Sequence, residues 1–179
     1  RWSLMRSIPA ILTLIFLFVS SAHGSVLTVD KVQGEQALLP YISWLADPGG
    51  EYGIDDMTRP ELQVEFKPLG HGVPLTANGP VWLRRVLRKS APEAGGLRAG
   101  DGRLSMSLGE LPPGKSELYL FERSGPVAGV SGWIKETLSP HSLTPLPDPG
   151  LTPMDVYIRM DNPPGLWFAP TVCPQEQLA

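Results

Sequence analysis

The chain is poor in the residues from which disulfides and metal sites are built. Its 179 residues include a single cysteine, Cys173, so no disulfide can form within one chain. Of three histidines, His23 lies in the N-terminal apolar segment, and His71 and His141 have no cysteine, histidine or acidic residue at metal-ligand spacing. We therefore expect a domain that folds without disulfides and holds no metal or other cofactor.

Catalytic motifs are also missing. The sequence has no G-x-S-x-G nucleophile turn and no glycine-rich phosphate-binding loop. Asp55 and Asp56 are the one conceivable carboxylate pair, but adjacent side chains point apart, which favours a turn or a helix start. Residues 47–50, Asp-Pro-Gly-Gly, have the composition of a turn, with a calcium site as the alternative. The sequence thus predicts a protein that is not an enzyme.

Positive charge is scarce. The formal net charge is −3 at pH 7, and it falls to −5 without residues 1–24, which hold two arginines and no acidic residue. The one basic cluster comprises Arg84, Arg85, Arg88 and Lys89 within and just after a predicted strand. Such a chain lacks the basic surface that nucleic acid requires, so we expect no nucleic-acid partner.

The main apolar run, residues 10–19, is too short to span a membrane, because a transmembrane helix needs about 20 apolar residues. Arg1 and Arg6 precede it, and small residues follow it at 20–22 and 24, as in a cleaved signal peptide. We expect residues 1–24 to be removed on export to the periplasm, with cleavage after Gly24 or Ala22. Met5 is a better start than Arg1, so residues 1–4 are expected to be upstream read-through.

Proline and glycine are abundant, at 20 and 19 residues, and they divide the chain into short extended segments. Apolar and polar residues alternate at 61–67, 81–87, 104–108, 118–121 and 156–160. This pattern predicts an all-β fold of six to eight strands, a jelly-roll-like antiparallel sandwich or a barrel. Helical turns fit only within 36–45 and 55–58, and 139–153 is predicted to be a loop. The expected core residues are Leu62, Val64, Phe66, Leu83, Leu118, Leu120 and Ile158.

Two predicted strands carry an aromatic residue and then an arginine two positions later. Trp82 with Arg84, and Tyr157 with Arg159, would lie on the face opposite the core. Together they would offer a flat ring and hydrogen-bond donors to a sugar or a carboxylate. The alternative is that these arginines stack on the aromatic rings or bond loop carbonyls and only cover the sheet.

Other residues on these strands have structural explanations. Arg85 interrupts the inward apolar pattern, which predicts a bulge or a sheet edge. Trp44, Trp133 and Trp167 are expected to anchor the core or the loops rather than to bind ligand.

An ordered set of short motifs resembles the periplasmic sensor domain, the type-2 extracellular domain, of 7TMR-DISM bacterial receptors. The motifs span 36–170 and lie at 45–50, 54–57, 66–68, 82–87, 118–120 and 156–160. The resemblance implies a jelly-roll-like sandwich similar to carbohydrate-binding modules, which precedes seven transmembrane helices and a cytoplasmic histidine kinase or diguanylate cyclase. With the signal peptide at 1–24, we expect a lead-in at 25–35, the sensor domain at 36–172, and the start of a linker at 173–179.

The resemblance favours the ligand-sensing domain of a truncated receptor, which binds a small molecule or glycan and acts on the membrane portion of the same receptor. A free-standing secreted carbohydrate-binding module is one alternative. A domain that binds no ligand and serves receptor homodimerisation is another, and a jelly-roll lyase or glycosidase is a third. Fold class alone does not separate these.

Overall fold

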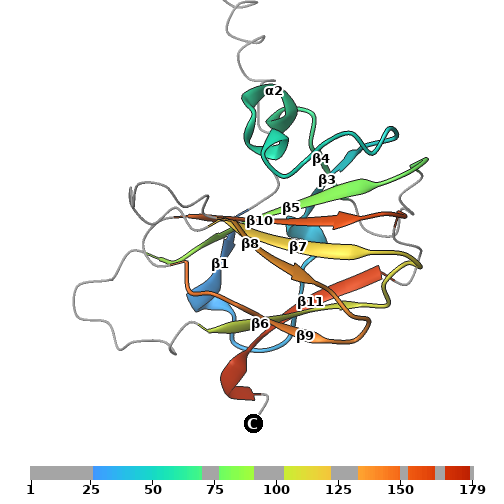
Figure 1. The fold of residues 1–179 in the computed structure, drawn as a ribbon. Coiled ribbons are helices and arrows are strands. Elements are labelled where there is room, and N and C mark those ends of the chain that lie inside the picture. The colour runs from blue at the N-terminus through green and yellow to red at the C-terminus, as the bar shows by residue number, and fades with distance from the viewer. Residues whose placement is uncertain are drawn as a thin grey trace, which may run out of the picture.

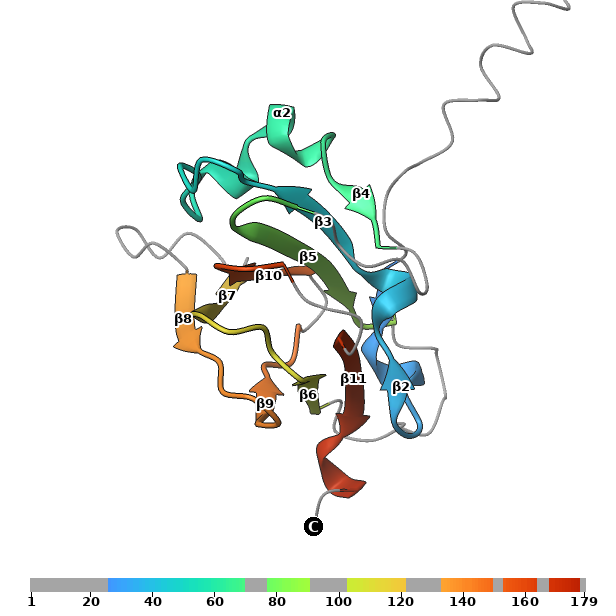
Figure 2. The same ribbon diagram turned by 90° about the vertical axis from the view of Figure 1, so that its right-hand side faces the viewer.

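The protein is a sandwich of two β-sheets (Figures 1 and 2). The computed structural model describes residues 26–69, 77–90, 103–121, 133–149, 153–163 and 168–177, so the predicted signal peptide lies outside the described residues. The seven-stranded sheet has the order β4 (Lys67–Pro68), β3 (Ser43–Ala46), β5 (Val81–Arg88), β10 (Met154–Met160), β7 (Ser116–Phe121) and β8 (Trp133–Thr137), with β1 (Leu27–Thr28) paired to β5. The four-stranded sheet has the order β2 (Gln36–Ala37), β11 (Phe168–Pro174), β6 (Leu104–Gly109) and β9 (Leu143–Leu146).

The chain passes repeatedly between the two sheets. From β5 it crosses to β6, returns for β7 and β8, crosses to β9, returns for β10 and ends in β11. All strand pairs are antiparallel among the described residues except β1 with β5. The predicted all-β antiparallel sandwich is therefore confirmed, although the described residues form eleven strands rather than the six to eight predicted. Among these residues no helix has the length and apolar composition needed to cross a bilayer.

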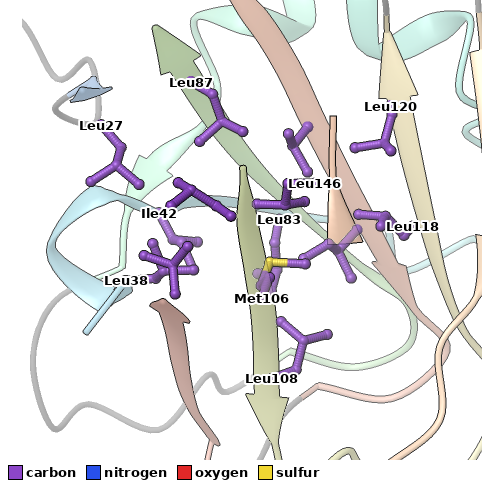
Figure 3. Packing of buried hydrophobic residues seen from close by; sticks show 14 of the residues in the cluster. Leu27, Leu38, Ile42, Leu83, Leu87, Met106, Leu108, Leu118, Leu120 and Leu146 are labelled. Carbon is purple, nitrogen blue, oxygen red and sulfur yellow. The ribbon is translucent and has the colours of Figure 1, made fainter. Parts of the chain in front are cut away.

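The core fills the space between the two sheets. In Figure 3 the side chains of Leu83 and Leu118 from one sheet point toward Met106 and Leu146 from the other. The alternation of apolar residues along each strand produces this layer, because every second side chain faces the opposite sheet. The predicted burial of Leu83, Leu118, Leu120 and Ile158 is confirmed.

The predicted strand at 61–67 is wrong. The 3₁₀ turn η3 (Asp56–Thr58) precedes this segment, which begins within the one-turn helix α2 (Pro60–Gln63) and reaches the short strand β4 only at Lys67. Proline suits the first turn of a helix because its missing N–H would have no partner there. Leu62 and Phe66 are both buried, as predicted, and lie four positions apart, a spacing that helices and strands share. Val64 lies between them and is 80% exposed, which corrects its predicted burial.

The helical turns η2 (Leu39–Tyr41) and η3 lie within the two predicted ranges, but η1 (Val29–Lys31), α2 and η4 (Gln175–Gln177) lie outside them. Strand β9 lies within the predicted loop 139–153. Pro145 is tolerated in β9 because that strand is at the end of its sheet in the described residues. The sandwich also extends beyond 36–172, because β1 precedes it and β11 continues to Pro174.

Replacing a core residue and an exposed residue of similar chemistry tests this arrangement. Leu118→Ala should lower the free energy of unfolding by about 2–5 kcal/mol, because Leu118 is fully buried. Val64→Ala should change it by less than about 0.5 kcal/mol, since Val64 faces solvent. Urea unfolding measures both values. A large loss with Val64→Ala would support the strand and contradict the helical turn.

Candidate functional site

The outer face of the seven-stranded sheet, which faces away from the four-stranded sheet, brings the predicted site residues together. Strands β5 and β10 are neighbours, and their register pairs Trp82 with Arg159 and Arg84 with Tyr157. Each aromatic residue thus lies directly opposite the arginine of the other strand, close enough for side-chain contact. The four residues form one block on a single face.

That block is covered rather than open. The exposed fraction is 0% for Trp82 and 1% for Tyr157, so the expectation of an exposed ligand platform is wrong. Both belong to a second hydrophobic cluster that lies outside the sheet, with Leu45, Met57, Leu62, Phe66 and Tyr119. Figures 1 and 2 show η3 and α2 on this side of the sheet, beyond β3 and β4. We refer to residues 52–66 as the cap.

Tyr157 ties the cap to the sheet. Its hydroxyl donates to the carbonyl of Met57 at 3.2 Å and accepts from Nε2 of Gln63 at 2.7 Å. Its ring packs against Phe66 at 6.2 Å and against Trp133 at 5.8 Å between centroids. Burial also raises the pKa of this hydroxyl. These contacts assign Tyr157 to the scaffold.

Asp47 holds the loop that leads into the cap. Its buried carboxylate accepts from the backbone N–H groups of Glu51 at 3.0 Å and Tyr52 at 3.2 Å. It also accepts from Nε1 of Trp82 at 3.4 Å, so it satisfies the only polar atom of that buried indole. Asp47 thus acts as a turn-forming residue. In the described part of the chain, no group of three or more His, Cys, Asp or Glu side chains could hold a metal ion.

Both arginines of the block pair with carboxylates. Nη2 of Arg84 lies 3.1 Å from Oδ1 of Asp155, and Nη1 of Arg159 lies 2.7 Å from Oδ1 of Asp161. Arg84 is mostly buried in this pair. The predicted alternative, in which the arginines help to cover the sheet, describes Arg84 better than a ligand contact does.

Arg85 points into the core side and is also buried. It donates from Nη1 to the carbonyl of Tyr41 at 2.6 Å, with its guanidinium 4.6 Å from the centre of the Tyr41 ring. Burial lowers its pKa to about 9. The pairing of β5 with β10 is continuous here, so the predicted bulge is wrong. On its other side β5 pairs with β3 as far as Arg84 and with β1 from Leu87, and Arg85 lies between the two.

Of the tryptophans, Trp44 is half-buried against the main core and Trp133 packs partly buried against the outer cluster. Both fit the anchoring role expected from the sequence. Trp167 and His71 lie outside the described residues.

Sequence reasoning missed a group of charged residues on the same face, where β7 meets β8. The Nζ atoms of Lys115 and Lys135 lie 2.6 Å and 2.8 Å from the same atom, Oε1 of Glu117. The Tyr119 hydroxyl donates to Oε2 of Glu117 at 2.8 Å. Burial alone would raise the pKa of Glu117, but bonds from Lys115, Lys135 and Tyr119 outweigh it and lower the pKa to about 2. We call these four residues the Glu117 cluster.

The Glu117 cluster presents positive charge to solvent. Glu117 is buried, whereas the lysine side chains are 54% exposed for Lys115 and 52% for Lys135. Its bonds to Glu117 and Tyr119 raise the pKa of Lys135, so that side chain stays protonated. A protonated lysine is neither a nucleophile nor a general base. The arrangement is therefore suited to binding an anion.

The alternation of Lys115, Glu117 and Tyr119 was visible in the sequence and places these three on one face of a strand. Lys135 was not detectable in this way, because its role depends on the register Tyr119↔Lys135 between β7 and β8.

Acidification tests the Glu117 cluster. A carboxylate whose pKa falls on folding stabilises the folded state above its unfolded pKa, and this contribution is lost as the pH falls through the folded value. With a folded pKa of about 2, Glu117 should contribute to a decrease in the free energy of unfolding from about pH 5 to pH 2. Glu117→Gln should show a shallower decrease over that range in urea titrations. Identical slopes for both proteins would contradict the ion pairs described here.

Truncation of Tyr157 tests the cap. Tyr157→Phe removes only the hydroxyl and should cost about 1–2 kcal/mol, because the Met57 carbonyl and Gln63 amide lose a buried partner. Tyr157→Ala also leaves a cavity and should cost about 3–5 kcal/mol. Thermal unfolding ranks the two variants. An alanine variant as stable as the natural protein would mean that this face is open, as the sequence first suggested.

A search against models of known protein families finds no match, and a search of curated proteins finds none either. The resemblance to the type-2 extracellular domain of 7TMR-DISM receptors therefore stays a prediction that rests on its short motifs.

Proposed function

We propose that this chain is a ligand-sensing domain of a bacterial membrane receptor, positioned in the periplasm, which binds a small molecule or glycan without altering it. The observation that carries the proposal is the Glu117 cluster. Two half-exposed lysine side chains converge on one buried carboxylate, beside the part of the sheet face that the cap covers. A binding site for a charged ligand needs charged groups that are held in place at the surface. A face that serves only the fold does not need them.

The other carboxylates near this face hold its structure. Asp155 pairs with Arg84 and Asp161 pairs with Arg159. Asp47 accepts from the backbone N–H groups of Glu51 and Tyr52 and from the Trp82 indole. Each of these carboxylates is thus engaged by partners within the protein, which supports a role in structure.

A second candidate is the dimerisation domain, and one observation favours it. β8 ends the seven-stranded sheet among the described residues, and its residue Ile134 is 47% exposed. Exposed strand edges with apolar side chains are common sites of strand pairing between chains. Analytical ultracentrifugation over a range of concentrations detects such a dimer, and Ile134→Lys should abolish it if β8 forms the interface.

Thermal shift with a panel of saccharides and organic acids tests the leading proposal. A specific ligand at 100 times its Kd should add about 2.7 kcal/mol to the stability of the folded protein. For a chain of this size that corresponds to an increase in Tm of roughly 5–10 °C. The same panel monitored by mass spectrometry should show every compound unchanged. No shift with any compound, or turnover that persists after repurification, would contradict the proposal.

A further inference from the structure

We infer that Lys115 and Lys135 form an anion-binding site and that the ligand of this domain carries a carboxylate, either on an acidic saccharide or on a small organic acid. This inference rests on the proposed function and names the class of ligand that the function would involve. It concerns Lys115, Lys135 and their support and does not use the buried aromatic residues of the block.

The first argument is the geometry of the two ammonium groups. Both contact the same oxygen of Glu117, at 2.6 Å and 2.8 Å, so they are close neighbours in space. Each ammonium has three N–H donors, which its ion pair with Glu117 does not exhaust. Both lysine side chains are about half exposed, so an approaching carboxylate can accept from both lysines at once.

The second argument is the rigidity of the support. The Tyr119 hydroxyl fixes the second oxygen of Glu117 at 2.8 Å, and the Tyr119 ring packs 5.6 Å from the Trp82 ring. Nζ of Lys135 also lies 5.4 Å from the centre of the Tyr119 ring, a cation–π contact. A free lysine loses rotamer entropy when it binds a ligand, and a lysine already held loses less. Glu117 is thus a positioning residue for the two cations.

The third argument is charge. One carboxylate between two ammonium groups leaves an excess of one positive charge, and the nearby Arg159 is balanced by Asp161. The chain as a whole has a formal net charge of −3, so this excess is local and opposite in sign to the protein. A single carboxylate group supplies the matching charge. A neutral sugar would leave the excess charge uncompensated.

Binding of a tri-galacturonate probe to the full chain tests the inference, with the methyl-esterified trimer as its uncharged counterpart and citrate as the small-acid arm. Isothermal titration should show binding of the acidic trimer or of citrate, and binding of the methyl ester at least tenfold weaker than the acidic trimer. Preference for the trimer over citrate identifies a saccharide ligand, and the reverse identifies a small acid. Equal affinity for the acidic and esterified trimers would overturn the inference.

Variants of the cluster supply the second part of the test. Lys115→Met and Lys135→Met should each raise the Kd of the preferred acid at least tenfold. Lys67→Met is the matched control, because Lys67 is an exposed lysine on β4, at the other end of the same sheet. It removes the same charge and should change the Kd less than twofold. Equal losses in all three variants would indicate general electrostatic attraction and overturn the inference.

Glu117→Gln separates a positioned site from simple attraction. The substitution makes the protein more positive, so attraction alone predicts tighter binding of an acid. The positioned site predicts at least fivefold weaker binding, because the lysines lose the group that holds them. Should this variant fail to fold, Tyr119→Phe removes only the hydroxyl that orients Glu117, leaves the charge unchanged and should weaken binding severalfold. Tighter binding by Glu117→Gln, or unchanged binding by a folded Tyr119→Phe, would overturn the inference.

These binding measurements also test the class of ligand separately from ligand sensing itself. If the esterified trimer or another neutral sugar binds and the lysine variants bind it normally, the ligand class is wrong while ligand sensing stands. If no compound of the wider panel binds, both fall together.

Discussion

Pairing between β5 and β10 determines what each face of the seven-stranded sheet carries. Their register pairs Leu83 with Ile158 on the core side and Trp82 with Arg159 on the outer side. Because side chains alternate along a strand, this single register fixes both faces at once. A slip by one residue would move Leu83 out of the core and turn Trp82 into it. The core and the block of Trp82, Arg84, Tyr157 and Arg159 on the outer face therefore both depend on the pairing of β5 with β10.

The need to cover the outer face explains the cap. Two buried aromatic side chains with polar atoms cannot be left against bare apolar surface without hydrogen-bond partners. Asp47 accepts from the Trp82 indole, and Gln63 and the Met57 carbonyl bond the Tyr157 hydroxyl. The cap covers this part of the sheet and leaves the lysines beside β7 and β8 in solvent. The same constraint therefore explains why the exposed charge lies where it does.

Sequence patterns predicted β5, β6, β7 and β10, because apolar residues alternate with other residues along these strands, as at 104, 106 and 108 in β6, but they did not predict β3 or β11. They failed at 61–67, where Leu62 and Phe66 lie four positions apart, a spacing common to one helical turn and two strand periods. The sequence pattern did not predict β8, for another reason. Most of its residues are exposed, so no apolar alternation marks it.

The sequence likewise predicted one part of the candidate site and missed another. Alternation within one strand predicted correctly that Trp82 and Arg84 share a face, and the neighbouring strand β10 supplies Tyr157 and Arg159. Whether another segment covers that face depends on the tertiary fold, which no local pattern encodes. The contact between Lys135 and Glu117 likewise depends on the pairing of β7 with β8. Local patterns specify which residues share a face, and the tertiary fold specifies which of them meet solvent.

The composition of the Glu117 cluster is the strongest reason to regard this face as more than scaffold. A buried carboxylate needs compensation, and one lysine with the Tyr119 hydroxyl would provide a charge partner and a hydrogen bond. The structure adds a second lysine on the same oxygen. The Lys115 side chain is about half exposed, so solvent screens its pairing with Glu117 and reduces what the pair adds to folding. The excess positive charge has a clearer physical use when an anion from outside the protein completes the site.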